Sequence, residues 1–331
     1  MRYIFYNGAM RKKRVGVLRG GPSSEYEVSL DTGDAVLKNM PDHYEPVDVF
    51  IDKKAVWHIH GIRHDVKDVL KKIDVAFNAM HGEYGEDGQV QELMDRFGVK
   101  YTGSKAFPSR VAMNKGMTKE FLIKECIKTP LYKIIKRKEF GPNTVSSLYQ
   151  TFPQPSVVKP LALGSSVGVS IAGNAAELAE ALDKAFSHSD AVLIEEFIKG
   201  REATCGVIDN FAGEEFHALA PIEIVPPTST DFYDYDAKYV NNETKYIIPG
   251  NFSELEKKQI QTTSALVHKA LGLRHYSRSD FIVNPRRGVY FLEVNTLPGM
   301  TSHSLIPKAV AHAGQSFTDF LDHVITLALK D

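Results

Sequence analysis

Two carboxylates and one amide lie in neighbouring strand-like runs near the C-terminal end of the chain, at Asp280, Glu293 and Asn295. The runs 279–283 and 289–294 are joined by Asn-Pro-Arg-Arg-Gly, which predicts a β-hairpin. Alternation along a strand puts Glu293 and Asn295 on one face, with Asp280 opposite Glu293 or one residue away. Facing carboxylates repel, and a divalent cation that prefers oxygen ligands, such as Mg²⁺, would relieve the repulsion. The alternative is a solvated hairpin face with unrelated charges.

A second candidate is a lysine that precedes a Gly/Ser-rich turn. Lys159 ends the strand-like run 155–159, and Gly164-Ser-Ser166-Val-Gly168 follows. Glycines let backbone N–H groups converge on phosphate oxygens, and the lysine adds a positive charge; an ordinary hairpin turn is the alternative. The same residues match the Gly-x-Ser-x-Gly nucleophile elbow of hydrolases, with Ser166 as the nucleophile. That motif requires a helix directly after the serine, whereas 167–171 predicts a strand.

A third candidate is the sequence Glu195-Glu196-Phe197-Ile198, which ends an apolar strand-like run, with Glu202 just beyond it. An apolar strand edge with free backbone groups can accept an adenine, and a nearby carboxylate can bind ribose hydroxyls. Glutamates at strand ends are more often simply solvated, so the alternative is a surface cluster. No P-loop sequence occurs in the chain, which excludes a P-loop nucleotide site.

The elements that position these residues begin with alternating strands and helices. Short apolar runs at 15–18, 47–51 and 74–78 predict buried strands, and the spacing over 28–40 and 88–97 predicts helices. This order indicates a doubly wound parallel sheet, whose ligands bind at the C-terminal ends of the strands. Polar clusters follow the first and third of these strands, at residues 20–25 and 81–88.

Beyond a boundary expected near 101–105, the pattern changes. We expect one helix over 108–127, another over 175–188 and a strand over 191–198. The last third is richer in strands. Its Pro/Tyr-rich stretch at 226–239 is too long and polar for a tight turn, which is typical of an active-site lid.

Composition limits the class of protein. The chain has 331 residues, 40 Lys and Arg against 41 Asp and Glu, and a net charge of −1, so nucleic acid is not expected as the main partner. Two cysteines cannot form a disulfide framework, which fits a reducing cytoplasm. No apolar run reaches the ~20 residues of a membrane span, and residues 1–14 lack a signal core. We therefore expect a cytoplasmic enzyme that binds neither nucleic acid nor membrane.

Together these motifs resemble the ATP-grasp fold and, more narrowly, the D-alanine–D-alanine ligase family. The resemblance runs from about residue 14 to the C-terminal end. The motifs that carry it are Gly20-Gly-x-Ser-x-Glu25-x-Glu-Val-Ser29, His81-Gly-x-x-Gly-Glu-Asp-Gly88, Tyr233-Asp-Tyr-x-Ala-Lys238-Tyr239, and Glu293-Val-Asn-Thr-x-Pro-Gly299-Met-Thr-Ser-His-Ser304-Leu305.

The resemblance implies an α/β and α+β protein: an N-terminal doubly wound parallel sheet followed by a two-part ATP-grasp fold. The implied domains are 1–105, 106–199 and 200–331, the last carrying the lid and the metal site. The implied reaction is ATP-dependent ligation of two D-alanines through an acylphosphate, for peptidoglycan. It would use ATP and two Mg²⁺ ions, with Mn²⁺ as a substitute, in a homodimer.

The resemblance also implies roles for individual residues. Nucleotide binding is implied for Lys115, Lys159, Ser166, Glu195, Glu196, Phe197, Ile198 and Glu202, and metal binding for Asp280, Glu293 and Asn295. Catalytic roles are implied for Glu25, Ser165 and Tyr239, which would bind the first ammonium, and for Arg278, which would stabilise the oxyanion. The remaining substrate contacts are implied for Ser29, His81, Tyr233, Lys238, Gly299, Ser304 and Leu305.

Alternatives differ in substrate or in class. The lid tyrosines Tyr233 and Tyr239 resemble those of dipeptide-forming members and disfavour an ester product, while D-serine stays open as second substrate. A serine hydrolase using Ser166 is disfavoured by the strand expected after it. A non-catalytic nucleotide-binding protein is disfavoured because the lysines, the arginine and the metal ligands are all present.

Overall fold

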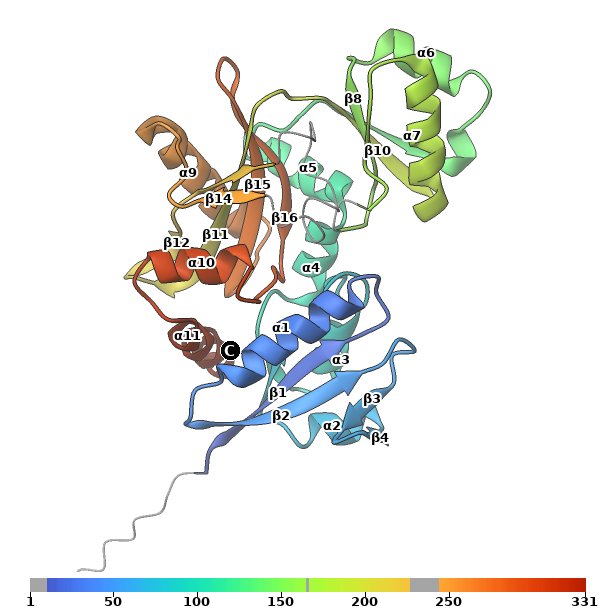
Figure 1. Cartoon of the computed structure of the whole chain (residues 1–331). Coiled ribbons are helices and arrows are strands. Elements are labelled where there is room, and N and C mark those ends of the chain that lie inside the picture. Colours follow the sequence, from blue (N-terminus) through green and yellow to red (C-terminus); the bar gives the residue numbers. More distant parts are fainter. Residues whose placement is uncertain (1–10, 165–166, 227–243) are drawn as a thin grey trace, which may run out of the picture.

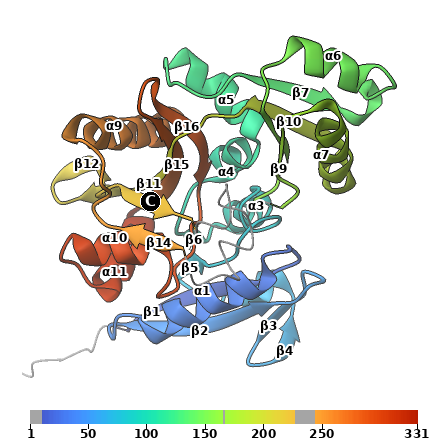
Figure 2. The same cartoon turned by 45° about the horizontal axis from the view of Figure 1, so that its top comes forward.

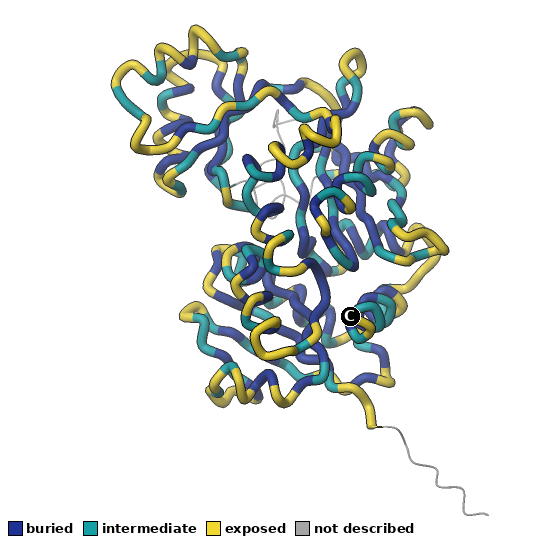
Figure 3. The backbone as a smooth tube through the Cα atoms, turned by 180° about the vertical axis from the view of Figure 1, so that it is seen from behind, coloured by how far each residue is buried: buried dark blue, intermediate teal, exposed yellow. Residues whose placement is uncertain are grey.

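The computed structural model describes residues 11–164, 167–226 and 244–331, which form three β-sheets. In both Figure 1 and Figure 2 the first sheet lies at the bottom, the second at the upper right and the third at the left. Figure 3 shows the strands mostly buried and the outer loops exposed. No helix among the described residues is long and apolar enough to cross a lipid bilayer.

The first sheet has six strands in the order β4-β3-β2-β1-β5-β6. β1 pairs in parallel with β2 and β5, and β5 with β6, whereas β3 and β4 are antiparallel additions at one edge. The predicted strands and helices of this region are confirmed. Their bounds are β1 (Lys13–Gly20), α1 (Tyr26–Lys38), β2 (Tyr44–Ile51), β3 (Trp57–Ile59), β4 (Ile62–His64), α2 (Val66–Leu70), β5 (Val75–Asn78), α3 (Gln89–Arg96) and β6 (Lys100–Tyr101).

Helices cover both faces of this sheet because alternate strand residues point to opposite sides. Val17 and Phe77 pack with α1 and with the C-terminal helix α11 (Phe317–Lys330). Leu18 and Ala76 pack with α2 and α3 on the other face. The first sheet therefore shares its core with the far end of the chain, which the sequence pattern did not indicate.

The second sheet has four antiparallel strands in the order β7-β10-β8-β9. The helix predicted over 175–188 is confirmed as α7, with Leu178, Leu182 and Phe186 buried. The bounds are β7 (Tyr132–Lys136), a 3₁₀ turn (Arg137–Glu139), α6 (Thr144–Thr151), β8 (Ser156–Pro160), β9 (Ser170–Ala172), α7 (Ala175–His188) and β10 (Ala191–Glu196).

Two predictions for this middle region are corrected. The strand expected over 167–171 begins only at Ser170, because residues 167 and 168 form a turn, with Gly168 at φ +72°. No helix follows that turn directly, which argues against the nucleophile elbow. The single helix expected over 108–127 is two helices, α4 (Ala106–Met113) and α5 (Lys115–Lys124). Asn114 breaks it, since its backbone is extended and its side chain accepts the Met117 N–H as the N-cap of α5.

The third sheet has six strands: β14-β13-β11-β15-β16, with β12 paired to β11. Helix α9, which begins with a Ser253–Glu256 capping box, packs with Phe281 and Phe291 of the β15–β16 hairpin. The bounds are β11 (Arg201–Phe211), β12 (Glu214–Ala218), β13 (Ile222–Val225), β14 (Lys245–Ile247), α9 (Glu254–Ala270), β15 (Tyr276–Asn284), β16 (Gly288–Asn295) and α10 (Leu305–His312).

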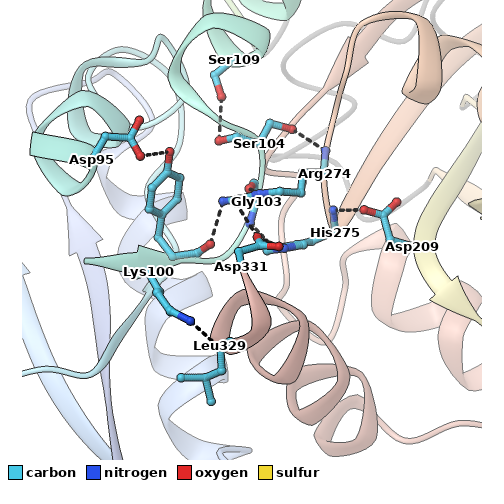
Figure 4. Close-up of polar contacts among 11 residues, drawn as sticks. Asp95, Lys100, Gly103, Ser104, Ser109, Asp209, Arg274, His275, Leu329 and Asp331 are labelled. Atoms are coloured by element: carbon cyan, nitrogen blue, oxygen red, sulfur yellow. Dashed lines mark hydrogen bonds and ion pairs between the residues drawn. The ribbon is translucent and has the colours of Figure 1, made fainter. Parts of the chain in front are cut away.

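A polar junction fastens the third sheet to the segment that follows β6 (Figure 4). The Arg274 guanidinium donates to the carbonyls of Tyr101 and Gly103, at 3.0 and 2.9 Å, and pairs with the C-terminal residue Asp331 at 2.5 Å. The His275 ring accepts the Gly103 N–H at Nδ1 and faces Asp331 at Nε2, so the neutral ring carries its proton on Nε2. Burial, reinforced by Arg274, lowers the pKa of His275 to about 4.

The junction yields a stability prediction for Arg274→Met. This change leaves two carbonyls without their donor and removes the ion pair with Asp331, and we expect it to lower the free energy of unfolding by about 2–3 kcal/mol. Arg286→Met is the matched control, because Arg286 is exposed in the β15–β16 turn. It should change the free energy by less than about 0.5 kcal/mol. Urea unfolding measures the free energy of unfolding of both variants. An equal decrease in the two would contradict the stabilising role assigned to the junction.

Candidate active site

A cleft of about 1180 Å³ opens between the three sheets. Among the described residues that the sequence predicted for the site, all line this cleft except Ser29. The Ser29 hydroxyl is fully buried, accepts the Gly20 N–H at 2.8 Å and donates to the Ala79 carbonyl at 3.0 Å. It therefore joins the ends of β1 and β5 beneath the cleft. Five predicted residues lie outside the described ones, as does most of the expected lid: Ser165, Ser166, Tyr233, Lys238 and Tyr239.

The β15–β16 hairpin supplies the acidic part of the cleft. Its register puts Asp280 opposite Glu293 and Arg278 opposite Asn295, with an irregularity just after Asp280. The Arg278 guanidinium donates to both Asp280 oxygens at 3.0 Å, and the Thr204 hydroxyl donates to one of them at 2.6 Å. Asn295 donates to the other at 3.2 Å. Protein donors thus stabilise a carboxylate that faces a second one.

The chemistry of these donors fits a hard divalent cation. Asp280 and Glu293 offer carboxylate oxygens from paired positions, and Asn295 adds an amide oxygen on the same face. Within the described ranges, no group of three His, Cys, Asp or Glu side chains forms a metal cluster. A set this small suits Mg²⁺, which usually keeps one or two carboxylates and completes its shell with phosphate oxygens and water.

Three lysines gather beside the hairpin. Asn114 starts α5 so that Lys115 lies at its first turn, where its ammonium donates to the Leu163 carbonyl at 2.6 Å and pairs with Glu293 at 3.2 Å. Lys159, on β8, pairs with Glu195 of β10 at 2.5 Å. Lys119, one turn after Lys115, pairs with the same carboxylate at 2.5 Å and is fully buried.

Lys119 was not singled out from the sequence. The only available signal was its spacing of four residues from Lys115, which places both side chains on one helix face. Burial would raise the pKa of Glu195, but the two lysines outweigh it and lower that pKa. Burial likewise opposes the charge of Lys159, yet Glu195 and Glu293 outweigh it and raise its pKa.

At the strand edge predicted to hold the adenine base, some polar groups are already bonded within the protein. Glu196 is largely neutralised, since it pairs with Arg287 at 3.1 Å and accepts the Leu131 N–H at 3.2 Å. Phe197 donates its N–H to the Pro155 carbonyl. The cleft wall around this edge is apolar and suits a flat ring; it is made by Val157, Ile171, Phe197, Ile198, Phe281 and Leu292.

The first sheet contributes His81 and Glu86, which hold the backbone of Leu297 after β16. The His81 Nδ1–H donates to the Leu297 carbonyl at 2.8 Å, and the ring Nε2 accepts from Thr32 at 2.8 Å. Glu86 accepts the Leu297 N–H at 3.0 Å and the Gly82 N–H at 2.8 Å. Burial lowers the pKa of His81, so the ring is neutral. Burial, together with Glu25, raises the pKa of Glu86 to about 8.

Glu86 was inside a quoted motif but received no role from the sequence. Its neighbour Glu25 is the N-cap residue of α1 and reaches across to the Gly/Ser turn. A Cβ on Gly82 would stand 2.8 Å from Glu25 Oε2, and one on Gly164 would stand 3.1 Å from it. Gly82 also has φ +69°, so glycine is required there on both counts.

The loop before α10 completes the cleft. Ser304 is the N-cap residue of α10; its Oγ accepts the Thr301 N–H at 3.0 Å, and a Cβ on Gly299 would lie 2.9 Å from it. The first N–H groups of α10, from Leu305 on, have no partner within the helix, so an anion is favoured there. The cleft therefore combines cations for phosphate, an acidic strand pair and an anion-favouring helix start.

Comparison with known proteins gives matches along nearly the whole chain. Residues 121–326 match the family described as D-ala D-ala ligase C-terminus, and residues 62–104 match D-ala D-ala ligase N-terminus. A D-alanine–D-alanine ligase of Geobacter sulfurreducens is 40% identical over 323 residues, covering 96% of this chain and 95% of that protein.

Solved structures agree in fold. The VanG D-Ala:D-Ser ligase of Enterococcus faecalis has a TM-score of 0.82 at 28% identity, covering 96% of this chain and 100% of that one. A D-alanine–D-alanine ligase of Bacillus anthracis complexed with ATP has a TM-score of 0.79 at 32% identity, covering 96% and 98%.

The raised pKa of Glu86 predicts a pH dependence of stability. The folded chain keeps this proton up to about pH 8, whereas an unfolded glutamate loses it near its ordinary value of 4.5. Folding therefore takes up a proton between these values, and its stabilising effect is lost as the pH rises. Glu86→Gln removes this titration. The free energy of unfolding of the variant, relative to that of the wild type, should therefore increase between pH 5 and pH 8.

Urea unfolding at pH 5, 6.5 and 8 measures that difference. Glu83→Gln is the control, because Glu83 is exposed in the same loop and should run parallel to the wild type. Parallel curves for Glu86→Gln as well would show that Glu86 is not protonated in the folded chain.

Proposed function

The chain belongs to the D-alanine–D-alanine ligase family, and we propose that it joins two D-alanines to D-alanyl-D-alanine, with cleavage of ATP to ADP and phosphate, for peptidoglycan synthesis. One observation carries the proposal beyond family membership: lysines, an arginine and an acidic strand pair from separate sheets line one cleft. Such a set suits phosphoryl transfer, which needs positioning and charge stabilisation more than an enzyme nucleophile.

For the nucleotide, we propose that Lys115 and Lys159 bind phosphate oxygens. The apolar wall near Phe197 and Ile198 would receive the adenine, with Glu195 and Glu202 at its polar edge. Glu196, already paired with Arg287, would contribute mainly through its backbone. ATP binding is supported by the family and by the related structure that contains ATP.

Asp280, Glu293 and Asn295 would hold Mg²⁺. The ion would supply positive charge at the transferring phosphoryl group. Arg278, fixed by its two bonds to Asp280, would face the oxyanion of the reacting carboxyl group. The number of ions, substitution by Mn²⁺ and a homodimer stay predictions.

The two amino acids would bind next to each other in the cleft, held by different groups. Glu25 would bind the ammonium of the first D-alanine, whose carboxylate takes the γ-phosphoryl group. The second D-alanine would place its carboxylate at Ser304 and the start of α10. Its amine attacks the acyl carbon, the C–O bond to phosphate breaks, and the amine loses a proton.

The second substrate needs a direct test, because one structural relative is a D-Ala:D-Ser ligase. The purified chain is given ATP and Mg²⁺ with D-alanine alone, or with D-serine, D-lactate or L-alanine. We expect ADP release that depends on D-alanine, with a product of the mass of D-alanyl-D-alanine. Release only with added D-serine or D-lactate would overturn the choice of second substrate, and none with any of them would overturn the ligase proposal.

Glu293→Gln tests the metal set. Replacing one charged ligand should lower turnover by about a hundredfold or more across a Mg²⁺ titration, with little change in melting temperature. Glu215→Gln, at an exposed site, is the control and should titrate like the wild type. Wild-type turnover by Glu293→Gln at every Mg²⁺ concentration would remove Glu293 from the metal site.

A further inference from the structure

Lys119 is the one member of the lysine group that does not line the cleft. This residue of α5 is fully buried, and its ammonium pairs with Glu195 Oε1 at 2.5 Å. The other carboxylate oxygen, Oε2, pairs with Lys159 at the same distance. Glu195 itself is only 2% exposed, so water does little to weaken these contacts. One carboxylate is therefore shared between a buried lysine and a lysine of the cleft.

The surroundings of Lys119 suit an ammonium ion. Besides Glu195, the nitrogen contacts the Thr129 hydroxyl and lies 5.4 Å from the centre of the Tyr132 ring, so a carboxylate, a hydroxyl and a π face surround it. Burial lowers the pKa of Lys119, and Glu195 opposes that shift. A fully buried lysine is uncommon unless it is paired, and nothing in the reaction outlined above uses this one.

The charge balance indicates what Lys119 does. Lys159 and Glu195 alone would form a neutral buried pair with little attraction for phosphate. With Lys119 added, the three side chains carry a net charge of +1, and Glu195 is drawn to both lysines. Lys159 then keeps positive charge to offer toward the cleft, where the nucleotide phosphates are proposed to lie.

We propose that Lys119 is a positioning residue for the nucleotide: by sharing the Glu195 carboxylate it leaves Lys159 free to bind phosphate. The inference rests on the proposed function only in taking Lys159 as a phosphate ligand. Lys119 touches neither nucleotide nor amino acid. Its effect should follow the phosphates of a ligand and not its base.

The test compares two ligands that differ only in phosphate. Dissociation constants of ADP and adenosine are measured by calorimetry on the full chain. Lys119→Met should weaken ADP binding by about tenfold or more and adenosine binding by less than about threefold, because only the charge acting on phosphate is lost. The ratio of the two constants is the readout, since a general loss of site structure would weaken both ligands together.

Two further variants separate charge from structure. Lys119→Arg keeps the charge and should retain the wild-type ratio. The double variant Lys119→Met with Glu195→Gln restores the net charge of +1 on Lys159 and should recover the ratio, even if Glu195→Gln weakens the binding of the base. Recovery of the wild-type ratio in the double variant supports the proposal. This holds even if Lys119→Met alone does not fold.

An unchanged ratio in Lys119→Met, or no recovery in the double variant, would overturn the proposal and leave Lys119 a structural residue. These binding measurements do not depend on turnover. A wild-type chain that binds ADP but releases none from ATP in response to D-alanine would contradict the proposed function, while the ratio would still decide the role of Lys119.

Discussion

The facing carboxylates of Asp280 and Glu293 are the constraint on which the rest of the cleft depends. Like charges at paired strand positions repel, and a recessed cleft screens them less than open water does. The chain meets this repulsion with cations from different elements: Arg278 on the same strand binds Asp280, and Lys115 on α5 binds Glu293. The break at Asn114 matters for this reason, because it starts α5 where Lys115 can reach the hairpin.

The same requirement explains how the first sheet is attached. His81 and Glu86 hold the two backbone groups of Leu297, directly after the acidic hairpin, while Arg274 and His275 hold the segment after β6. The two sets of bonds join the first and third sheets at separate points. Residues proposed to bind the two amino acids therefore lie on elements whose relative position is fixed by hydrogen bonds between side chains and backbone.

Burial gives three acidic or basic groups near the cleft different protonation states. Glu86 has backbone N–H donors but also a neighbouring carboxylate, and its pKa rises to about 8. Glu195 is more thoroughly buried, yet two lysines lower its pKa. His81 stays neutral because burial outweighs the nearby Glu25. Residue type alone does not decide the charge of the site; the nearest partner of each buried group does.

The sequence by itself determined what local geometry controls. The register of the β15–β16 hairpin follows from a short turn, and its one irregularity lies just after Asp280, so the pairing of Asp280 with Glu293 is predictable only to within one residue from the chain's own pattern. The α7 core face and three strands of the first sheet, β1, β2 and β5, follow from periodicity in the same way. The motifs at 20–29, 81–88 and 293–305 were sufficient to indicate the family.

Only the tertiary structure decided the rest, because burial and charge partners arise from residues far apart in the chain. Nothing local marks Lys119 as buried or Glu86 as protonated, and both depend on elements that meet only after folding. The docking of α11 on the first sheet and the use of the Ser29 hydroxyl by backbone groups are further cases. Periodicity shows which face of an element is apolar, but not which other element will cover it.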